Sequence, residues 1–146
     1  MKSYKYVKMM FWLGLAGVLF SGYLSSVKFF TSTCALNEPC PYFLGYPACY
    51  FGFGMFLIIF VSALLGLMKK ISEKGTAQIL TTISALGILF AGYFTIPEIQ
   101  KLLSNTETGY SLGLPTCAYG LVFYLLIFIL SLSYLRKGEQ SINGSR

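Results

Sequence analysis

The sequence contains no histidine and very few carboxylates. Its 146 residues include only five acidic side chains. The missing histidine excludes Ser-His-Asp and Cys-His catalysis and histidine-ligated metals, and the scarcity of acids leaves little for carboxylate-dyad chemistry. Charged residues make up 11% of the chain, well below the roughly 25% of a soluble domain. An ordinary soluble globular domain is therefore excluded, and other groups must carry any chemistry.

Apolar residues, in contrast, make up 55% of the chain, and its mean hydropathy is +0.68. Four stretches contain no charged residue, and they are 9–26, 48–68, 77–96 and 114–135. Each approaches the ~20 residues with which a helix crosses ~30 Å of hydrocarbon while satisfying its own backbone. The first stretch is too long for a signal-peptide core and lacks an A-x-A-like site after it, which favours a retained span. The sequence predicts an all-α membrane protein, a single four-transmembrane-helix bundle over 1–146.

Basic residues gather on one side of these spans. The segment 2–8, the connection 69–74 and the tail 136–146 each carry three lysines or arginines. Only Lys28 and Lys101 fall on the other side. By the positive-inside rule, both termini and the middle connection are cytoplasmic. The net charge of +6 is therefore an orientation signal and an attraction to anionic lipid, and it does not indicate a nucleic-acid partner.

The two halves of the chain, about 9–70 and 77–137, repeat each other. The segment GVLFSGYL at 17–24 resembles GILFAGYF at 87–94, and LGYPACYFG at 44–52 resembles LGLPTCAYG at 112–120. The segments follow in the same order in both halves, and each half ends in a pair of basic residues. Each half is an up-down helical hairpin in the same orientation, so the repeat is parallel. Two such hairpins are expected to pack about a pseudo-two-fold axis along the membrane normal.

All four cysteines fall on the extracytoplasmic side in this topology, where disulfides are permitted. Cys34 and Cys40 lie in the first external connection, and Cys49 and Cys117 lie at the external ends of the second and fourth spans. The Cys34-x5-Cys40 spacing suits either a labile disulfide open to thiolate attack or a static staple. Zinc is disfavoured, because the four cysteines contain no C-x2–4-C knuckle. We expect no metal.

The repeated L-G-x-P-x-C segment indicates how Cys49 and Cys117 are presented. Its glycine (Gly45 or Gly113) allows a tight turn, and its proline suits the first turn of a helix, where no amide hydrogen is needed. The cysteine then lies near the third helical position, where free backbone amides and the helix dipole stabilise a thiolate. Two interpretations stay open: a redox cysteine in each repeat, or a small apolar packing residue.

With four spans, a C-x5-C in the first external connection and a second span opening on G-x-P, the chain resembles the vitamin K epoxide reductase family and the DsbB-type oxidases. The resemblance covers the chain from the first to the fourth span. Cys34 and Cys40 match the loop pair of the family, and Cys117 matches the second cysteine of its C-x-x-C. Leu114 stands in place of the first cysteine, and the family's serine-containing segment before Gly45 is missing.

The resemblance implies a membrane thiol-disulfide oxidoreductase that uses a quinone. A thiol of an extracytoplasmic, thioredoxin-like partner would attack the Cys34–Cys40 disulfide, and electrons would pass through Cys49 and Cys117 to the quinone. Cys49 would replace the missing cysteine if the pseudo-two-fold axis brings it to Cys117, which requires Cα atoms within about 7 Å. Aromatic residues near these cysteines are candidates for an aromatic slot around the quinone ring, with lipid-interface and packing roles as the alternative: Phe20, Tyr23, Tyr50, Phe90, Tyr93 and Tyr119.

The alternative function is that of a small non-catalytic membrane protein, structural, partner-binding or transport-like, whose disulfides only fix loops. Proton-coupled transport is disfavoured, because no span holds an ionisable acid or base. Four small residues allow either close helix packing or a homodimer: Gly14, Gly17, Ser62 and Gly66.

The ends of the third and fourth spans give two further expectations. Proline at its start and apolar residues on one face predict that 97–103 is a short interfacial helix. The polar residues 138–146 are expected to be a disordered tail. The Asn143-Gly-Ser145 sequon should carry no glycan, because the tail is cytoplasmic.

Overall fold

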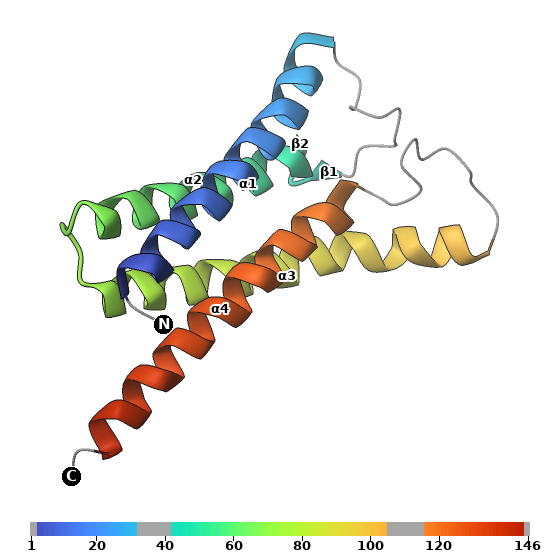
Figure 1. Ribbon diagram of the computed structural model, residues 1–146. Coiled ribbons are helices and arrows are strands. Elements are labelled where there is room, and N and C mark those ends of the chain that lie inside the picture. Colours follow the sequence, from blue (N-terminus) through green and yellow to red (C-terminus); the bar gives the residue numbers. More distant parts are fainter. Residues whose placement is uncertain (1–2, 32–41, 105–115, 145–146) are drawn as a thin grey trace.

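The computed structural model describes residues 3–31, 42–104 and 116–144. Within these ranges the chain forms four helices and one very short hairpin (Figure 1). The elements are α1 (Ser3–Thr31), β1 (Tyr42–Phe43), β2 (Tyr46–Pro47), α2 (Ala48–Leu67), α3 (Glu73–Leu103) and α4 (Thr116–Gly144). All four helices are long and apolar enough to cross a membrane, which confirms the predicted all-α, multi-pass membrane fold.

The helices form two hairpins, α1 with α2 and α3 with α4, and α2 also packs against α3 (Figure 1). The start of α1, the α2–α3 connection and the end of α4 lie at one end of the bundle, called here the basic end. The helices α2 and α4 both begin at the opposite end, called here the cysteine end. In an up-down bundle with an even number of spans, the first span begins and the last span ends on the same side, as α1 and α4 do here.

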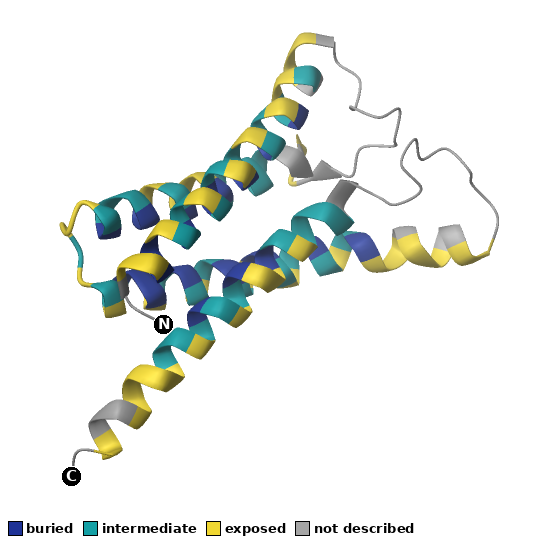
Figure 2. Ribbon diagram, viewed as in Figure 1, coloured by how far each residue is buried: buried dark blue, intermediate teal, exposed yellow. Residues whose placement is uncertain are grey.

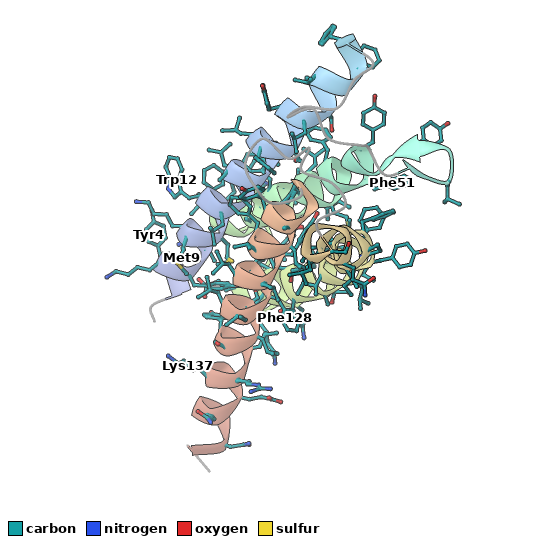
Figure 3. All side chains as sticks on the ribbon, turned by 90° about the vertical axis from the view of Figure 1, so that its right-hand side faces the viewer. Tyr4, Met9, Trp12, Phe51, Phe128 and Lys137 are labelled. Atoms are coloured by element: carbon teal, nitrogen blue, oxygen red, sulfur yellow. The ribbon has the colours of Figure 1, made fainter. Side chains whose placement is uncertain are left out.

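The outer surface is apolar, as lipid contact requires. Buried residues lie along the inner faces of the helices, and exposed residues cover the outer faces (Figure 2). Trp12 points away from α1 and is 59% exposed (Figure 3). Because lipid chains are as apolar as a protein core, large apolar side chains on this surface are stabilised by the bilayer and need no partner in the protein.

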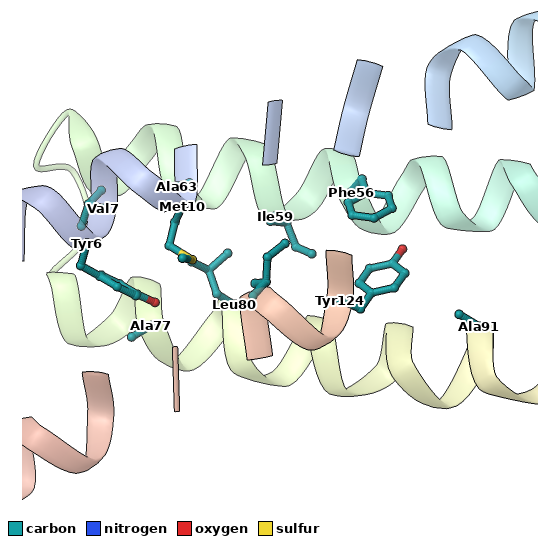
Figure 4. Close-up of a cluster of buried hydrophobic side chains, with 11 residues drawn as sticks. Tyr6, Val7, Met10, Phe56, Ile59, Ala63, Ala77, Leu80, Ala91 and Tyr124 are labelled. Atoms are coloured by element: carbon teal, nitrogen blue, oxygen red, sulfur yellow. The ribbon is translucent and has the colours of Figure 1, made fainter. Parts of the chain in front are cut away.

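The internal repeat is visible in the side-chain packing. A β-carbon at Gly17 would overlap the Phe56 ring, and one at Gly87 would lie 2.5 Å from the Tyr124 ring. Phe56 and Tyr124 are 68 positions apart, the same spacing as Cys49 and Cys117. The two rings stack on each other with centroids 4.4 Å apart (Figure 4). Each hairpin therefore closes on an equivalent glycine–aromatic contact, and the two contacts meet in the Phe56–Tyr124 stack between α2 and α4.

Near the basic end, a tyrosine pair joins α1 to α4. The Tyr6 and Tyr134 rings stack with centroids 4.3 Å apart. The Tyr6 hydroxyl donates to Ser131 Oγ at 2.7 Å, and the Tyr134 hydroxyl donates to Glu73 Oε2 at 3.2 Å. Since Glu73 begins α3, these contacts fix three helices to one another near the basic end.

The small residues that allowed either helix packing or a homodimer pack inside the chain. Gly14 faces the backbone of Phe60, and Gly66 faces the side chain of Thr76. Gly17 faces Phe56, as described above, and Ser62 is buried. These residues bring neighbouring helices of one chain close together, so they do not form a free surface for a second copy.

The third span and the segment after it form one continuous helix. The segment 97–103 is helical as predicted, but α3 runs through Pro97 to Leu103 without a break, so it is not a separate helix. Proline removes one amide donor and disfavours the α conformation of the residue before it. One lost hydrogen bond near the end of a 31-residue helix does not stop its propagation, because the costly nucleation step is already complete.

The expected disordered tail is also helical as far as the structure describes it. The helix α4 continues to Gly144, and its last residues are exposed and project beyond the bundle (Figures 1 and 2). Polarity suggests disorder, but Glu139 and Gln140 are good helix formers, and no proline interrupts the helix between Lys137 and Gly144. An established helix extends over such residues at little cost.

The helix α2 ends in a hydrogen-bonded reversal at the basic end. The Lys70 amide donates to the Leu65 carbonyl at 2.9 Å, and the Lys69 amide donates to the Gly66 carbonyl at 3.1 Å. This pair of bonds is the Schellman arrangement, which places the residue after the helix in the left-handed region, usually as glycine. Lys69 has a φ of +59°. A lysine side chain is therefore kept at a position where its β-carbon costs about 1–2 kcal/mol.

We expect Lys69→Gly to raise the free energy of unfolding by about 0.5–1 kcal/mol, because the relieved strain exceeds the added entropy of the unfolded chain. The measurement is unfolding in mixed detergent micelles. Lys70→Gly is the matched control, since Lys70 is not among the residues with positive φ, and it should lower stability slightly. A Lys69→Gly protein less stable than the Lys70→Gly protein would contradict the assigned strain.

Candidate functional site

The predicted redox cysteines divide between described and undescribed parts of the chain. Cys34 and Cys40 lie outside the described residues. Cys49 is the second residue of α2 and Cys117 is the second residue of α4, and for both the structure describes the backbone only. The two cysteines therefore occupy equivalent positions of the two hairpins, at the same end of the bundle (Figure 1).

The β1–β2 hairpin determines where α2 begins. Tyr42 pairs with Pro47 and Phe43 pairs with Tyr46, and the two residues between the strands, Leu44 and Gly45, both have positive φ. Gly45 thus forms the tight turn that the sequence predicts. Pro47 belongs to β2 and immediately precedes the helix, whereas we expected it in the first helical turn. Cys49 is consequently one position nearer to the helix start than expected.

The first turns of α2 and α4 suit a thiolate electrostatically. Neither turn contains an acidic residue. The first amides of a helix lack intrahelical acceptors, and the helix dipole places partial positive charge there. A cysteine at the second position therefore meets favourable backbone charge and no opposing carboxylate from its own turn, which is the environment that favours a reactive thiolate.

The two helix starts lie above the Phe56–Tyr124 stack. The Tyr124 hydroxyl donates to the Gly52 carbonyl at 3.2 Å, and Gly52 is one turn along α2 from Cys49. Cys49 precedes Phe56 by seven residues and Cys117 precedes Tyr124 by seven. At 1.5 Å per residue this spacing is about 10 Å along each helix axis. The backbones of both cysteines thus lie about two turns beyond the Phe56–Tyr124 stack.

Three of the six aromatic residues predicted to hold a quinone lie at helix interfaces near these starts. Phe20 of α1 contacts Tyr119 of α4 with ring centroids 6.3 Å apart. Phe90 of α3 contacts Phe51 of α2, which Figure 3 labels, with ring centroids 5.8 Å apart. The internal repeat relates Phe20 to Phe90 and Phe51 to Tyr119. The bundle therefore has two equivalent aromatic contacts, one on each side of the central stack.

The other three predicted residues lie elsewhere. Tyr23 is 64% exposed on the outer face of α1, and Tyr93 is 71% exposed on the outer face of α3. Tyr50 is half-buried at the start of α2. The six residues therefore do not gather in one slot: Tyr23 and Tyr93 face the surroundings of the bundle, as interfacial tyrosines do.

Sequence reasoning missed Phe51, Phe56 and Tyr124, although they make the central contacts. A signal for them was present. Extending the alignment of the repeated segments LGYPACYFG and LGLPTCAYG by one turn pairs Phe56 with Tyr124. Two aromatic residues at equivalent positions near a pseudo-two-fold axis are expected to meet.

Thr95 of α3 carries a buried polar atom without a partner. The residue is 1% exposed, and its hydroxyl has no hydrogen bond within the part of the chain that the structure describes. Gly87 faces Tyr124 across the antiparallel α3–α4 contact. Thr95 follows Gly87 by eight residues, and Thr116 precedes Tyr124 by eight residues, so the two threonines lie at the same level of this antiparallel pair. The unpartnered hydroxyl is therefore level with the first turn of α4, where Cys117 lies.

In comparisons with known proteins, no family model, curated protein or solved structure matches this chain.

Proposed function

We propose that the protein is a membrane thiol-disulfide oxidoreductase that transfers electrons from an extracytoplasmic thiol protein to a membrane quinone. The observation that carries the proposal is the equivalent placement of Cys49 and Cys117 at the second positions of α2 and α4, at the same end of the bundle. The surrounding helix starts favour a thiolate, and the Phe56–Tyr124 stack joins α2 to α4 two turns along from them.

The proposed reaction balances as a two-electron relay. A thiolate of the partner attacks the Cys34–Cys40 disulfide and forms a mixed disulfide. The second thiol of the partner then attacks the partner's sulfur in that bond and displaces the loop thiolate, which leaves an oxidised partner and a reduced loop pair. The loop dithiol reduces a Cys49–Cys117 disulfide by the same exchange. The resulting Cys49–Cys117 dithiol gives two electrons and two protons to the quinone, forming hydroquinone and restoring the disulfide.

The direction of the chain in the membrane follows from its charges. The connection between α2 and α3 carries three lysines, and the start of α1 and the end of α4 lie at the same basic end (Figures 1 and 3). By the positive-inside rule this end is cytoplasmic, so the cysteine end faces the oxidising compartment. A glycan on Asn143, or a C-terminal tag labelled only from outside, would contradict this orientation.

The proposal is tested with the purified full-length protein in lipid nanodiscs. The protein is reduced with excess dithiothreitol, the reductant is removed, and a short-chain ubiquinone or menadione is added under nitrogen. We expect one quinone to be reduced for every two thiols lost, with thiols counted by maleimide gel shift. Thiols that stay reduced in the presence of either quinone would overturn the proposal. A disulfide that resists reduction while the protein stays folded would support the non-catalytic alternative.

Within this function, the Thr95 hydroxyl is the hydrogen-bond donor for a thiolate or a quinone oxygen at the first turn of α4. We expect Thr95→Val to slow quinone-dependent thiol oxidation by roughly 10- to 100-fold, because a hydrogen bond to a charged group contributes about 1.5–3 kcal/mol. Thr95→Ser, which keeps the hydroxyl, should retain most of the rate. The measurement is the rate of thiol oxidation in nanodiscs.

Stability distinguishes this role from a structural one. Removing an unpartnered buried hydroxyl should leave the free energy of unfolding unchanged or raise it, because a desolvated polar group is lost without a broken bond. The alkylation of Cys117 by iodoacetamide should also shift to higher pH in Thr95→Val. A Thr95→Val protein that is destabilised but oxidises its thiols at the normal rate would assign Thr95 to packing alone.

A further inference from the structure

The basic end carries a surface pocket of about 450 Å³ that the redox function does not use. The turn 69–74 forms most of its lining, and Gly66 of α2 and Tyr134 of α4 complete it. Three helices thus contribute to the pocket, and the stacked Tyr6–Tyr134 pair holds α4 against it. The pocket is therefore part of the folded bundle and lies far along the helices from the cysteines (Figure 1).

The pocket has an excess of positive charge. Lys69, Lys70 and Lys74 line it and are exposed. None of these three lysines has an ion-pair partner within residues 3–31, 42–104 and 116–144. Glu73, the only acidic side chain among the described residues of the lining, accepts a hydrogen bond from the Tyr134 hydroxyl. The lining thus holds three lysine ammonium groups and one carboxylate that is already hydrogen-bonded. This net positive charge favours an anionic ligand.

The position of the pocket identifies the source of that anion. The candidate membrane span of α2 ends at Leu67, and that of α3 begins at Glu73. The turn that forms most of the pocket joins these two spans, so its lysines are expected at the depth of the lipid headgroups. The exposed apolar residue Met68 immediately precedes the turn. A ligand with a phosphate at this depth and an acyl chain below it matches both the charge of the pocket and its apolar neighbour.

We infer that this pocket binds the phosphate of an anionic phospholipid headgroup. The lysine ammonium groups supply the attraction. The Ser72 hydroxyl accepts a bond from the Gly75 amide at 3.1 Å and keeps its own hydrogen for the ligand. The site is independent of the proposed thiol oxidation, because it lies at the opposite end of the bundle and contains no cysteine.

The test compares lipid binding by the full-length protein and two triple variants. The pocket variant carries Lys69→Gln, Lys70→Gln and Lys74→Gln. The control variant carries Lys5→Gln, Lys8→Gln and Lys137→Gln, which removes the same charge from exposed residues at the same end of the bundle (Figure 3). Each protein is titrated in detergent with phosphatidylglycerol or phosphatidylcholine, and native mass spectrometry counts retained lipids.

We expect the unchanged protein to retain phosphatidylglycerol in preference to phosphatidylcholine. Loss of a lysine near a membrane surface weakens anionic binding about fivefold, so the pocket variant should lose about 100-fold in affinity. The control variant should keep most of the preference. Equal losses in the two variants would overturn the site and assign the effect to the diffuse surface potential.

A second arm separates the lipid from a free anion. Inorganic phosphate is added at millimolar concentration during the phosphatidylglycerol titration, with chloride at matched ionic strength as the reference. We expect the two salts to weaken lipid binding equally, because free phosphate lacks the acyl chains that add to the affinity of the lipid and therefore acts at this concentration only by screening. Stronger displacement by phosphate than by chloride would overturn the lipid assignment in favour of a soluble phosphate ligand.

Discussion

Replacing Cys117 with serine is expected to lower the rate of quinone-dependent thiol oxidation roughly a thousandfold, close to the uncatalysed rate. The thiolate is the nucleophile in both thiol exchange and quinone reduction, and a serine hydroxyl at the start of α4 can neither ionise there nor form a disulfide. The measurement is hydroquinone formation by nanodisc-embedded protein supplied with dithiothreitol.

Cys49→Ser should reduce the rate by a similar factor if Cys49 is the partner of Cys117, since one thiol cannot deliver two electrons and end as an intramolecular disulfide. Cys34→Ser and Cys40→Ser serve as the matched comparison. They should block electron transfer from a protein thiol but leave reoxidation of the Cys49–Cys117 dithiol by quinone intact. Thiol counting then shows two cysteines oxidised by quinone in each of these loop variants.

The opposite pattern would assign the cysteines differently. Full activity in Cys49→Ser would exclude the cross-helix pair. A disulfide mapped between Cys49 and either loop cysteine would change the order of the relay, because four cysteines allow three pairings. If every single variant oxidised its remaining thiols as slowly as the unchanged protein, the disulfides would be structural and the chain would be a non-catalytic bundle.

The spans and the repeat were predictable from the sequence because the bilayer constrains them directly. A chain in lipid must form uninterrupted helices of about 20 apolar residues. The repeated segments then require equivalent contacts, and the Gly17–Phe56 and Gly87–Tyr124 pairs supply them. Helix ends were predicted less well. Pro97 lies inside α3, and α4 continues past Lys137, because beyond the membrane local propensity and helix propagation decide where a helix stops.

Composition could not predict which aromatic side chains point outward and which pack between helices. In a soluble helix a polar stripe marks the outer face, but a membrane helix is apolar on all sides. Nothing local distinguishes exposed Tyr23 from half-buried Phe20, which lies less than one turn away. Packing decides the difference: Phe20 reaches Tyr119 of α4, while Tyr23 points outward.

The largest effect on folding is expected at the two glycines that face the central stack. A β-carbon at Gly87 would lie 2.5 Å from Tyr124, a fully packed ring that also stacks on Phe56. Since neither ring can move freely, we expect Gly87→Ala to lower the free energy of unfolding by about 1–3 kcal/mol. The equivalent Gly17→Ala should have a similar cost. Unfolding by sodium dodecyl sulfate in mixed micelles measures both.

Gly92→Ala provides the control on the same helix, because a β-carbon there meets no atom within 4 Å. Alanine is a better helix former than glycine, so this variant should be neutral or more stable by up to about 1 kcal/mol. The sign of the effect thus depends on what the added carbon touches. In a Tyr124→Ala background, Gly87→Ala should become nearly harmless, giving a coupling energy of about 1–3 kcal/mol between the two positions. Additive effects would mean that Gly87 does not pack against Tyr124, and the repeat would then lack one of its two equivalent closing contacts.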